Sequence, residues 1–107
     1  MEPPTSKKLG MLMKLTAGGS TDPFHWYALA LEYGNLQRFD EALQAFTTLR
    51  ARTPDYVPMY LMCGQMLERI HRKDEARDWY EAGVRAARAK GETHAESEIG
   101  AALAALG

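Results

Sequence analysis

Arg38-Phe39-Asp40-Glu41-Ala42 returns 34 residues later as Arg72-Lys73-Asp74-Glu75-Ala76. The large apolar residues around these two stretches keep the same offset, so that Trp26 aligns with Tyr60. A fixed period of this length is typical of helix–turn–helix units, which bury their apolar faces by stacking on copies of themselves. The sequence therefore predicts an all-α protein built from helical repeats.

The apolar residues of the first repeat match a known signature. They read Trp26-x-x-Leu29-Ala30-x-x-Tyr33, then Ala42-x-x-x-Phe46, then Pro54, which resembles the tetratricopeptide pattern W-x₂-L-G-x₂-Y…A-x₃-F…P with alanine in place of glycine. The resemblance implies helical pairs stacked as a short right-handed superhelix. It also implies a concave groove, lined by the first helix of each pair, that holds a peptide or a helix of a partner protein.

The second repeat is a weaker copy of the same pattern. It reads Tyr60-x-x-Cys63-Gly64-x-x-Leu67 and then Ala76-x-x-x-Tyr80, with Arg88 at the place of the proline. Because proline ends a helix and arginine does not, we expect the last helix of this repeat to run on.

Caps and helix breakers divide a single domain of residues 1–107 into four parts. Asp22-Pro23 opens a helix, because aspartate caps the first turn and proline needs no N–H donor there, and Asp55-Tyr56-Val57-Pro58 repeats this signal. Pro54 and Gly91 each end a helix. The expected parts are an amino-terminal helix (5–17), a first repeat (23–56, helices 23–33 and 39–52), a second repeat (57–90, helices up to 70 and 74–90) and a capping helix (93–106).

The last helix is expected to cap the repeats. Ile99-Gly100-x-x-Leu103 resembles the start of a third repeat. Gly83 predicts that this helix approaches closely, because a glycine inside an exposed helix costs about 1 kcal/mol relative to alanine and needs another reason to be there.

The first helix has two possible roles. At helical spacing Leu9, Leu12, Met13 and Thr16 share one face, which predicts that this helix caps the other end of the array. The connector Gly18-Gly19-Ser20-Thr21 also permits movement, so that the helix could instead gate the groove. The sequence leaves both alternatives open.

Composition narrows the class of function. With 13 basic and 14 acidic residues the net charge is −1, which gives no field that attracts nucleic acid. The single cysteine forms no intrachain disulfide and fits a reducing compartment, the cytoplasm. The amino terminus lacks the basic start of a signal peptide, and the apolar stretch Leu9–Leu15 is too short to cross a membrane. We therefore expect a cytoplasmic protein with no nucleic-acid or membrane partner.

No set of residues predicts catalysis. Cys63 with His25, His71 and His94 is the one nucleophile-and-base set worth testing, but Cys63 occupies a core position of the repeat, where a free thiol is inert. The three histidines lack the spacing of metal ligands. We therefore expect no enzyme activity, no metal and no cofactor.

The resemblance places a partner-binding groove on the first helix of each repeat. The relatives that clamp a carboxy-terminal carboxylate use lysine, asparagine and arginine on this face, whereas here the matching places are mostly apolar, so that a carboxylate clamp is not supported. The expected groove residues are Phe24, Tyr27, Leu31 and Asn35 of the first repeat and Leu61, Gln65, Glu68 and Arg69 of the second.

Two functions of different classes remain. In the preferred one the chain is a small adaptor, a monomer or weak homodimer, whose apolar groove takes a helix or strand of a partner protein. In the other the chain is a self-assembling structural unit, whose groove is covered by its own amino-terminal helix or by a second copy. The oligomeric state in solution distinguishes the two.

Overall fold

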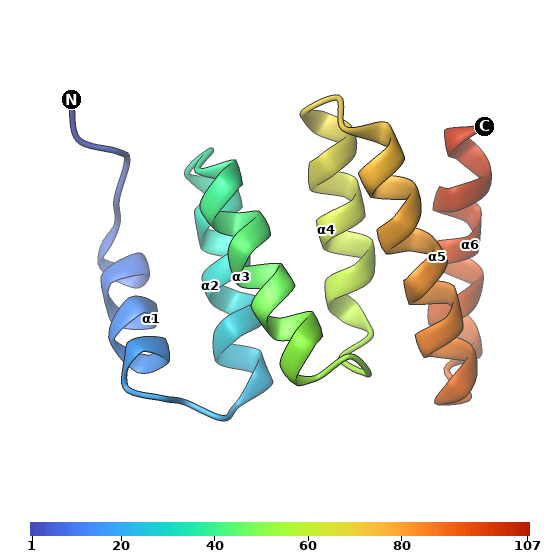
Figure 1. Cartoon of the computed structure of the whole chain (residues 1–107), viewed down its shortest axis with the longest axis horizontal. Coiled ribbons are helices and arrows are strands. Elements are labelled where there is room, and N and C mark those ends of the chain that lie inside the picture. Colours follow the sequence, from blue (N-terminus) through green and yellow to red (C-terminus); the bar gives the residue numbers. More distant parts are fainter. The chain divides into compact units, whose positions relative to one another are not determined.

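The computed structural model describes all residues, 1–107, and is entirely helical (Figure 1). The chain divides into two compact units, Met1–Thr53 and Pro54–Gly107, which we describe in turn. The six helices are α1 (Lys7–Ala17), α2 (Pro23–Asn35), α3 (Phe39–Arg52), α4 (Pro58–Arg69), α5 (Lys73–Ala89) and α6 (Thr93–Leu106).

In the first unit α2 is the central helix, because it contacts both α1 and α3 while α1 does not contact α3. The Asp22 carboxylate accepts the N–H of Phe24 at 2.9 Å, and Pro23 occupies the first turn, as the sequence predicts. Leu29 and Ala30 of α2 pack with Phe46 of α3, and all three are at most 5% exposed. The first repeat is thus one antiparallel helical pair.

Helix α1 lies against α2 through the face that the sequence indicates, with one exception. Leu9, Leu12 and Thr16 are buried, and the Thr16 hydroxyl satisfies its hydrogen bond on the Leu12 carbonyl oxygen at 2.9 Å. Met13, expected on this face, is 43% exposed. Because successive residues of a helix are about 100° apart, Met13 falls at the edge of the narrow stripe that the other three form.

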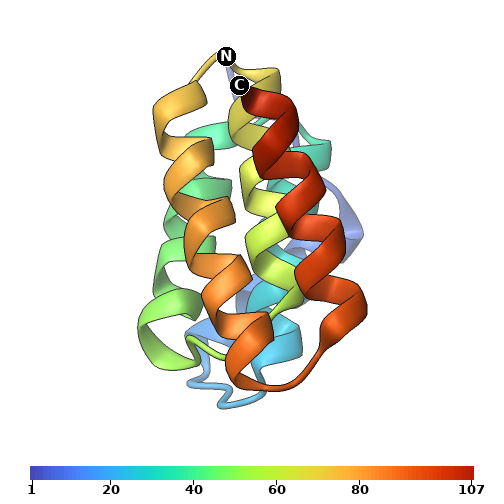
Figure 2. The same cartoon turned by 90° about the vertical axis from the view of Figure 1, so that its right-hand side faces the viewer.

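The second unit contains three mutually contacting helices, α4, α5 and α6, which run side by side in Figure 2. Tyr60, Leu67 and Tyr80 are almost completely buried between them. Helix α5 has 17 residues against 14 in α3, which confirms that the helix runs on where Arg88 replaces proline. The prediction that Asp55 caps the next helix as Asp22 caps α2 is wrong. Helix α4 begins at Pro58, its N-cap residue is Val57, and no side chain caps it.

Two glycines explain how closely the helices of the second unit approach. A Cβ added to Gly64 would collide with the ring of Tyr80, and one added to Gly83 would lie 2.5 Å from the Cβ of Tyr60 and 3.2 Å from Cδ1 of Ile99. The last helix therefore does pack on Gly83, as expected, but the tighter contact is with Tyr60 of α4.

The turn between the two helices of a pair has the same hydrogen bonds in both repeats. In the first repeat the N–H of Gln37 donates to the Gly34 carbonyl oxygen and that of Arg38 to the Tyr33 carbonyl oxygen. His71 and Arg72 make the same two bonds 34 residues later. This is the Schellman arrangement that ends a helix with one left-handed residue, and accordingly Gln37 and His71 have φ of 60° and 63°.

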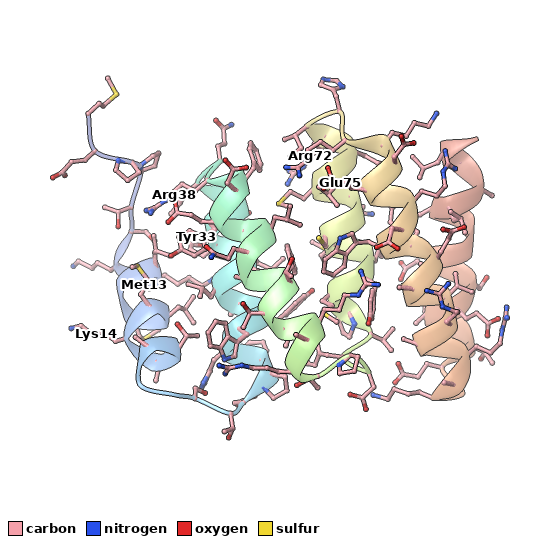
Figure 3. All side chains as sticks on the ribbon, in the orientation of Figure 1. Met13, Lys14, Tyr33, Arg38, Arg72 and Glu75 are labelled. Atoms are coloured by element: carbon pink, nitrogen blue, oxygen red, sulfur yellow. The ribbon has the colours of Figure 1, made fainter.

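The repeated Arg-x-x-Glu brackets the start of the second helix of each pair. Arg38 donates from Nε and Nη2 to the two carboxylate oxygens of Glu41 at 2.6 and 2.7 Å. Arg72 and Glu75 form the same bidentate pair (Figure 3). These hydrogen bonds lower the pKa of Glu41 and of Glu75. The motif that reveals the repeat therefore orders the junction between paired helices.

Candidate functional site

The four groove residues expected in the first repeat lie on one face of α2. Phe24 is 56% exposed, Asn35 is exposed, and Tyr27 and Leu31 are half-buried. At about 100° per residue this face is turned away from the side of α2 that packs on α3. The structure therefore groups an exposed aromatic ring with two partly accessible apolar side chains.

The four residues expected in the second repeat lie on α4 and are more polar. Leu61 is half-buried, whereas Gln65, Glu68 and Arg69 are exposed. Glu68 is turned towards α5, because its carboxylate accepts a hydrogen bond from the Tyr80 hydroxyl. Burial and this hydrogen bond raise the pKa of Tyr80. Glu68 thus serves the packing of the second unit, and Leu61, Gln65 and Arg69 form the accessible face of α4.

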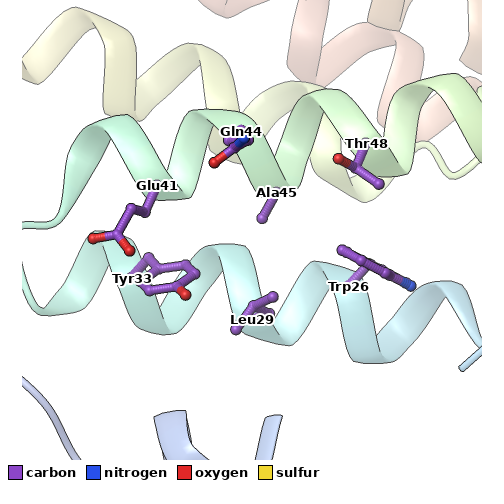
Figure 4. A pocket seen from close by; sticks show the side chains of 7 residues that line it. All are labelled: Trp26, Leu29, Tyr33, Glu41, Gln44, Ala45 and Thr48. Atoms are coloured by element: carbon purple, nitrogen blue, oxygen red, sulfur yellow. The ribbon is translucent and has the colours of Figure 1, made fainter. Parts of the chain in front are cut away.

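A hollow of about 250 Å³, which we did not predict from the sequence, lies between α2 and α3 of the first unit. Figure 4 shows the Ala45 methyl pointing from α3 towards Leu29, with Trp26 and Tyr33 to either side. The side chains that line the hollow are Trp26, Leu29, Tyr33, Glu41, Gln44, Ala45 and Thr48. The signal for it was present in the repeat, because Ala45 aligns with the much larger Trp79.

Both ends of this hollow carry ordered cations. The guanidinium of Arg38 lies 5.0 Å from the ring centroid of Tyr33 and also donates to the Pro4 carbonyl oxygen at 2.9 Å. The guanidinium of Arg52 lies 4.7 Å from the ring centroid of Trp26. Each cation stacks on an aromatic face, which orders the two rings.

The candidate nucleophile is not accessible in the structure. Cys63 is completely buried. His25 shares a 2.7 Å hydrogen bond with the Ser20 hydroxyl in the connector before α2, where it fixes the chain locally. The structure contains no group of three or more histidine, cysteine or acidic residues able to hold a metal ion. None of the six helices combines the length and the apolar character that a membrane crossing requires.

Helical pairs related by a 34-residue offset define the chain as a helical-repeat protein. The tetratricopeptide repeat family model matches residues 27–92, and the chain belongs to this family. No curated protein matches the sequence.

Solved structures agree with this assignment. The chain is similar to a tetratricopeptide repeat domain protein from Salinibacter ruber whose solution structure is known. The two sequences are 37% identical and the structures superpose with a TM-score of 0.76, and the match covers 80% of this chain and 87% of that one. A crystal structure of such a protein from the same organism has 38% identity and a TM-score of 0.72 over 79% and 94%. A Bordetella parapertussis protein with 22% identity and a TM-score of 0.78, covering 95% and 89%, shares the fold.

Proposed function

We propose that this chain is a small adaptor that binds a peptide or helix of a partner protein through the first helices of its repeats. The observation that carries the proposal is the position of Phe24, which is 56% exposed at the start of the face that continues with Tyr27 and Leu31. An aromatic ring held in water by a rigid helix is a typical anchor of a protein interface. Its burial by a partner would stabilise the complex.

The two helices contribute different chemistry to this proposed interface. On α2, Tyr27 and Leu31 offer apolar area, whereas on α4 the place aligned with Leu31 is Gln65. Apolar contacts provide affinity, and polar contacts at exposed positions provide selectivity. We therefore propose that the partner segment carries an apolar anchor for α2 and hydrogen-bonding groups for α4.

A pair of matched variants tests the proposal. Phe24→Glu and Met11→Glu change two residues of nearly equal exposure, 56% and 57%, on different helices of the same unit. Proteins captured from the native cell by the wild-type chain should be retained by Met11→Glu and lost with Phe24→Glu. Equal retention by the two variants contradicts the proposal, once circular dichroism has shown that both remain folded.

The double variant Tyr27→Ala, Leu61→Ala extends the test to both repeats. Because these side chains are half-buried, the variant must first be compared with the wild type by thermal unfolding. A folded double variant is expected to lose the same captured proteins as Phe24→Glu. If the folded double variant still captures those proteins, the binding face does not include Tyr27 and Leu61.

Self-assembly is the second candidate, and the surface of α1 favours it. Met11 and Leu15, four residues apart, are both exposed on one side of α1, and exposed apolar side chains that lie together are a common feature of subunit contacts. Light scattering over a range of concentrations tests self-assembly, because a molecular mass that stays at that of the monomer at every concentration would count against it. A mass that rises with concentration and falls back in Met11→Glu would favour self-assembly.

The remaining features fit an adaptor of the cytoplasm. The one thiol, Cys63, is buried and reduced, as is usual in a reducing compartment. The near balance of 13 basic and 14 acidic residues supports a protein partner over a nucleic acid. We propose no enzymatic role.

A further inference from the structure

We propose that the hollow between α2 and α3 is a second binding site, which takes the side chain of a tryptophan from a partner protein. The hollow has a volume of about 250 Å³ and an apolar floor of Leu29, Tyr33 and Ala45 (Figure 4). It lies on the side of α2 opposite to Phe24, and it therefore adds a surface to the one proposed above.

The second unit shows which side chain this space suits. Position 45 of the first repeat aligns with Trp79, which is 6% exposed and has its ring centroid 5.9 Å from that of Tyr60. Tyr60 in turn aligns with Trp26. In the second repeat an indole therefore fills the place beside the first aromatic residue, whereas in the first repeat a methyl group leaves that place hollow.

Larger side chains at neighbouring positions of the first repeat do not fill the space left by alanine in place of tryptophan at position 45. Leu29 and Tyr33 are larger than their counterparts Cys63 and Leu67, yet the hollow persists. Protein interiors pack at nearly uniform density, and a hollow of this size lined by apolar atoms lacks the contacts that a ring would supply. A flat aromatic group is thus the occupant that the two repeats together indicate.

The polar side chains at the edge of the hollow favour one kind of aromatic ring over the others. Glu41, Gln44 and Thr48 of α3 place oxygen atoms above the apolar floor. Indole carries one N–H donor and no acceptor, so that it can bury its ring and still donate to one of these oxygens. The Glu41 carboxylate is already neutralised by Arg38, which disfavours a cationic anchor. A tryptophan matches this arrangement better than a phenylalanine or a lysine does.

The experiment begins with the wild-type chain and two small probes. N-acetyl-tryptophanamide and N-acetyl-phenylalaninamide are titrated while NMR follows the indole N–H of Trp26 and the methyl group of Ala45. We expect both signals to shift on addition of the tryptophan probe, and to shift much less with the phenylalanine probe. Unchanged signals, or equal response to the two probes, would overturn the proposal.

A substitution that fills the hollow provides a second test of the proposal. Ala45→Trp should place the indole of the second repeat into the first, raise the melting temperature, and weaken binding of the tryptophan probe at least about tenfold. The matched control is Ala51→Trp, which changes an exposed residue of the same helix and should leave binding unchanged. An Ala45→Trp chain that binds the probe normally, or that fails to fold, contradicts the proposal, because either result means that the space is not available.

A third arm distinguishes a partner protein from a free metabolite. Free tryptophan carries a charged amino and a charged carboxyl group, whereas the charged pair beside the hollow, Arg38 and Glu41, is already engaged in its own hydrogen bonds. The blocked probe is therefore expected to bind more tightly than the free amino acid. Tighter binding of free tryptophan would contradict a partner side chain as the occupant.

Discussion

At the scale of single residues, small side chains set how closely the helices of the second unit approach. Gly64 faces the ring of Tyr80, and Gly83 faces Tyr60 and Ile99. Gly100 has no atom within 4 Å of the place where its Cβ would stand, although it too lies inside a helix. The glycines of this chain therefore fall into two classes that substitution can separate.

We expect Gly64→Ala and Gly83→Ala each to lower the free energy of unfolding by about 1–3 kcal/mol, because the added methyl group would overlap buried ring and Cβ atoms. Gly100→Ala should raise it by up to about 1 kcal/mol, because alanine favours the helix and meets no neighbour. Urea unfolding of the three variants measures these changes. A neutral Gly83→Ala would show that the approach of α5 to α4 is looser than the structure shows.

The left-handed residues between paired helices allow a second test. Gln37 and His71 adopt φ of 60° and 63°, where a side chain is strained and glycine is not. Gln37→Gly and His71→Gly should therefore each stabilise the chain by about 0.5–1 kcal/mol, after allowance for the greater freedom of glycine in the unfolded state. Gly91→Ala, at φ 70°, should destabilise it. Destabilisation by both glycine substitutions would argue against the Schellman turns.

At the scale of elements, the helices could be predicted from the sequence because their signals are local. Phe39–Arg52 and Thr93–Leu106 have the expected bounds, since Pro54, Gly91 and the terminal turns act within a few residues. The burial of Met13 was predicted wrongly because the position of α2 decides which edge of α1 is covered. The hollow at Ala45 was missed for the same kind of reason, since it depends on the size of residues from two helices.

The contact between α1 and α2 predicts the behaviour of the amino-terminal helix. Besides its buried leucines, the Ser6 hydroxyl donates to the Glu32 carboxylate at 2.7 Å, and Arg38 holds the Pro4 carbonyl oxygen. We expect the amide protons of Leu12 and Thr16 to exchange as slowly as those in the centre of α2, because both helices open together. Fast exchange confined to α1, measured by hydrogen–deuterium NMR, would instead indicate a gating helix.

The pair α4 and α5 should respond to alkali through Tyr80. Its pKa is raised from the ordinary value of 10.0 by burial and by the Glu68 carboxylate. A group with a raised folded pKa contributes its stability in full below the unfolded pKa and loses it as the pH rises further. The free energy of unfolding should therefore fall above about pH 10 in the wild type and fall less steeply in Tyr80→Phe. Identical slopes in the two chains would contradict this role of Tyr80.

At the scale of the whole molecule, the chain contains two compact units that each combine one helical pair with one further helix. The repeat made the fold predictable, because a period of 34 residues is a global signal carried by many positions. The candidate binding surfaces were only partly predictable. The sequence left Phe24 open between core and groove, and the structure shows it 56% exposed. The hydrogen bond from Tyr80 to Glu68 could not be predicted, because it depends on how α4 and α5 pack.

The face of α2 that carries Phe24 is the surface proposed to meet a partner protein, and site-specific photo-crosslinking in the native cell is the sharpest test of that proposal. Benzoyl-phenylalanine replaces Phe24 in one chain and the equally exposed Met11 in a matched control. We expect a discrete crosslinked protein from position 24 that is absent from position 11. Adducts from position 11 alone, or none from position 24, would contradict the proposal.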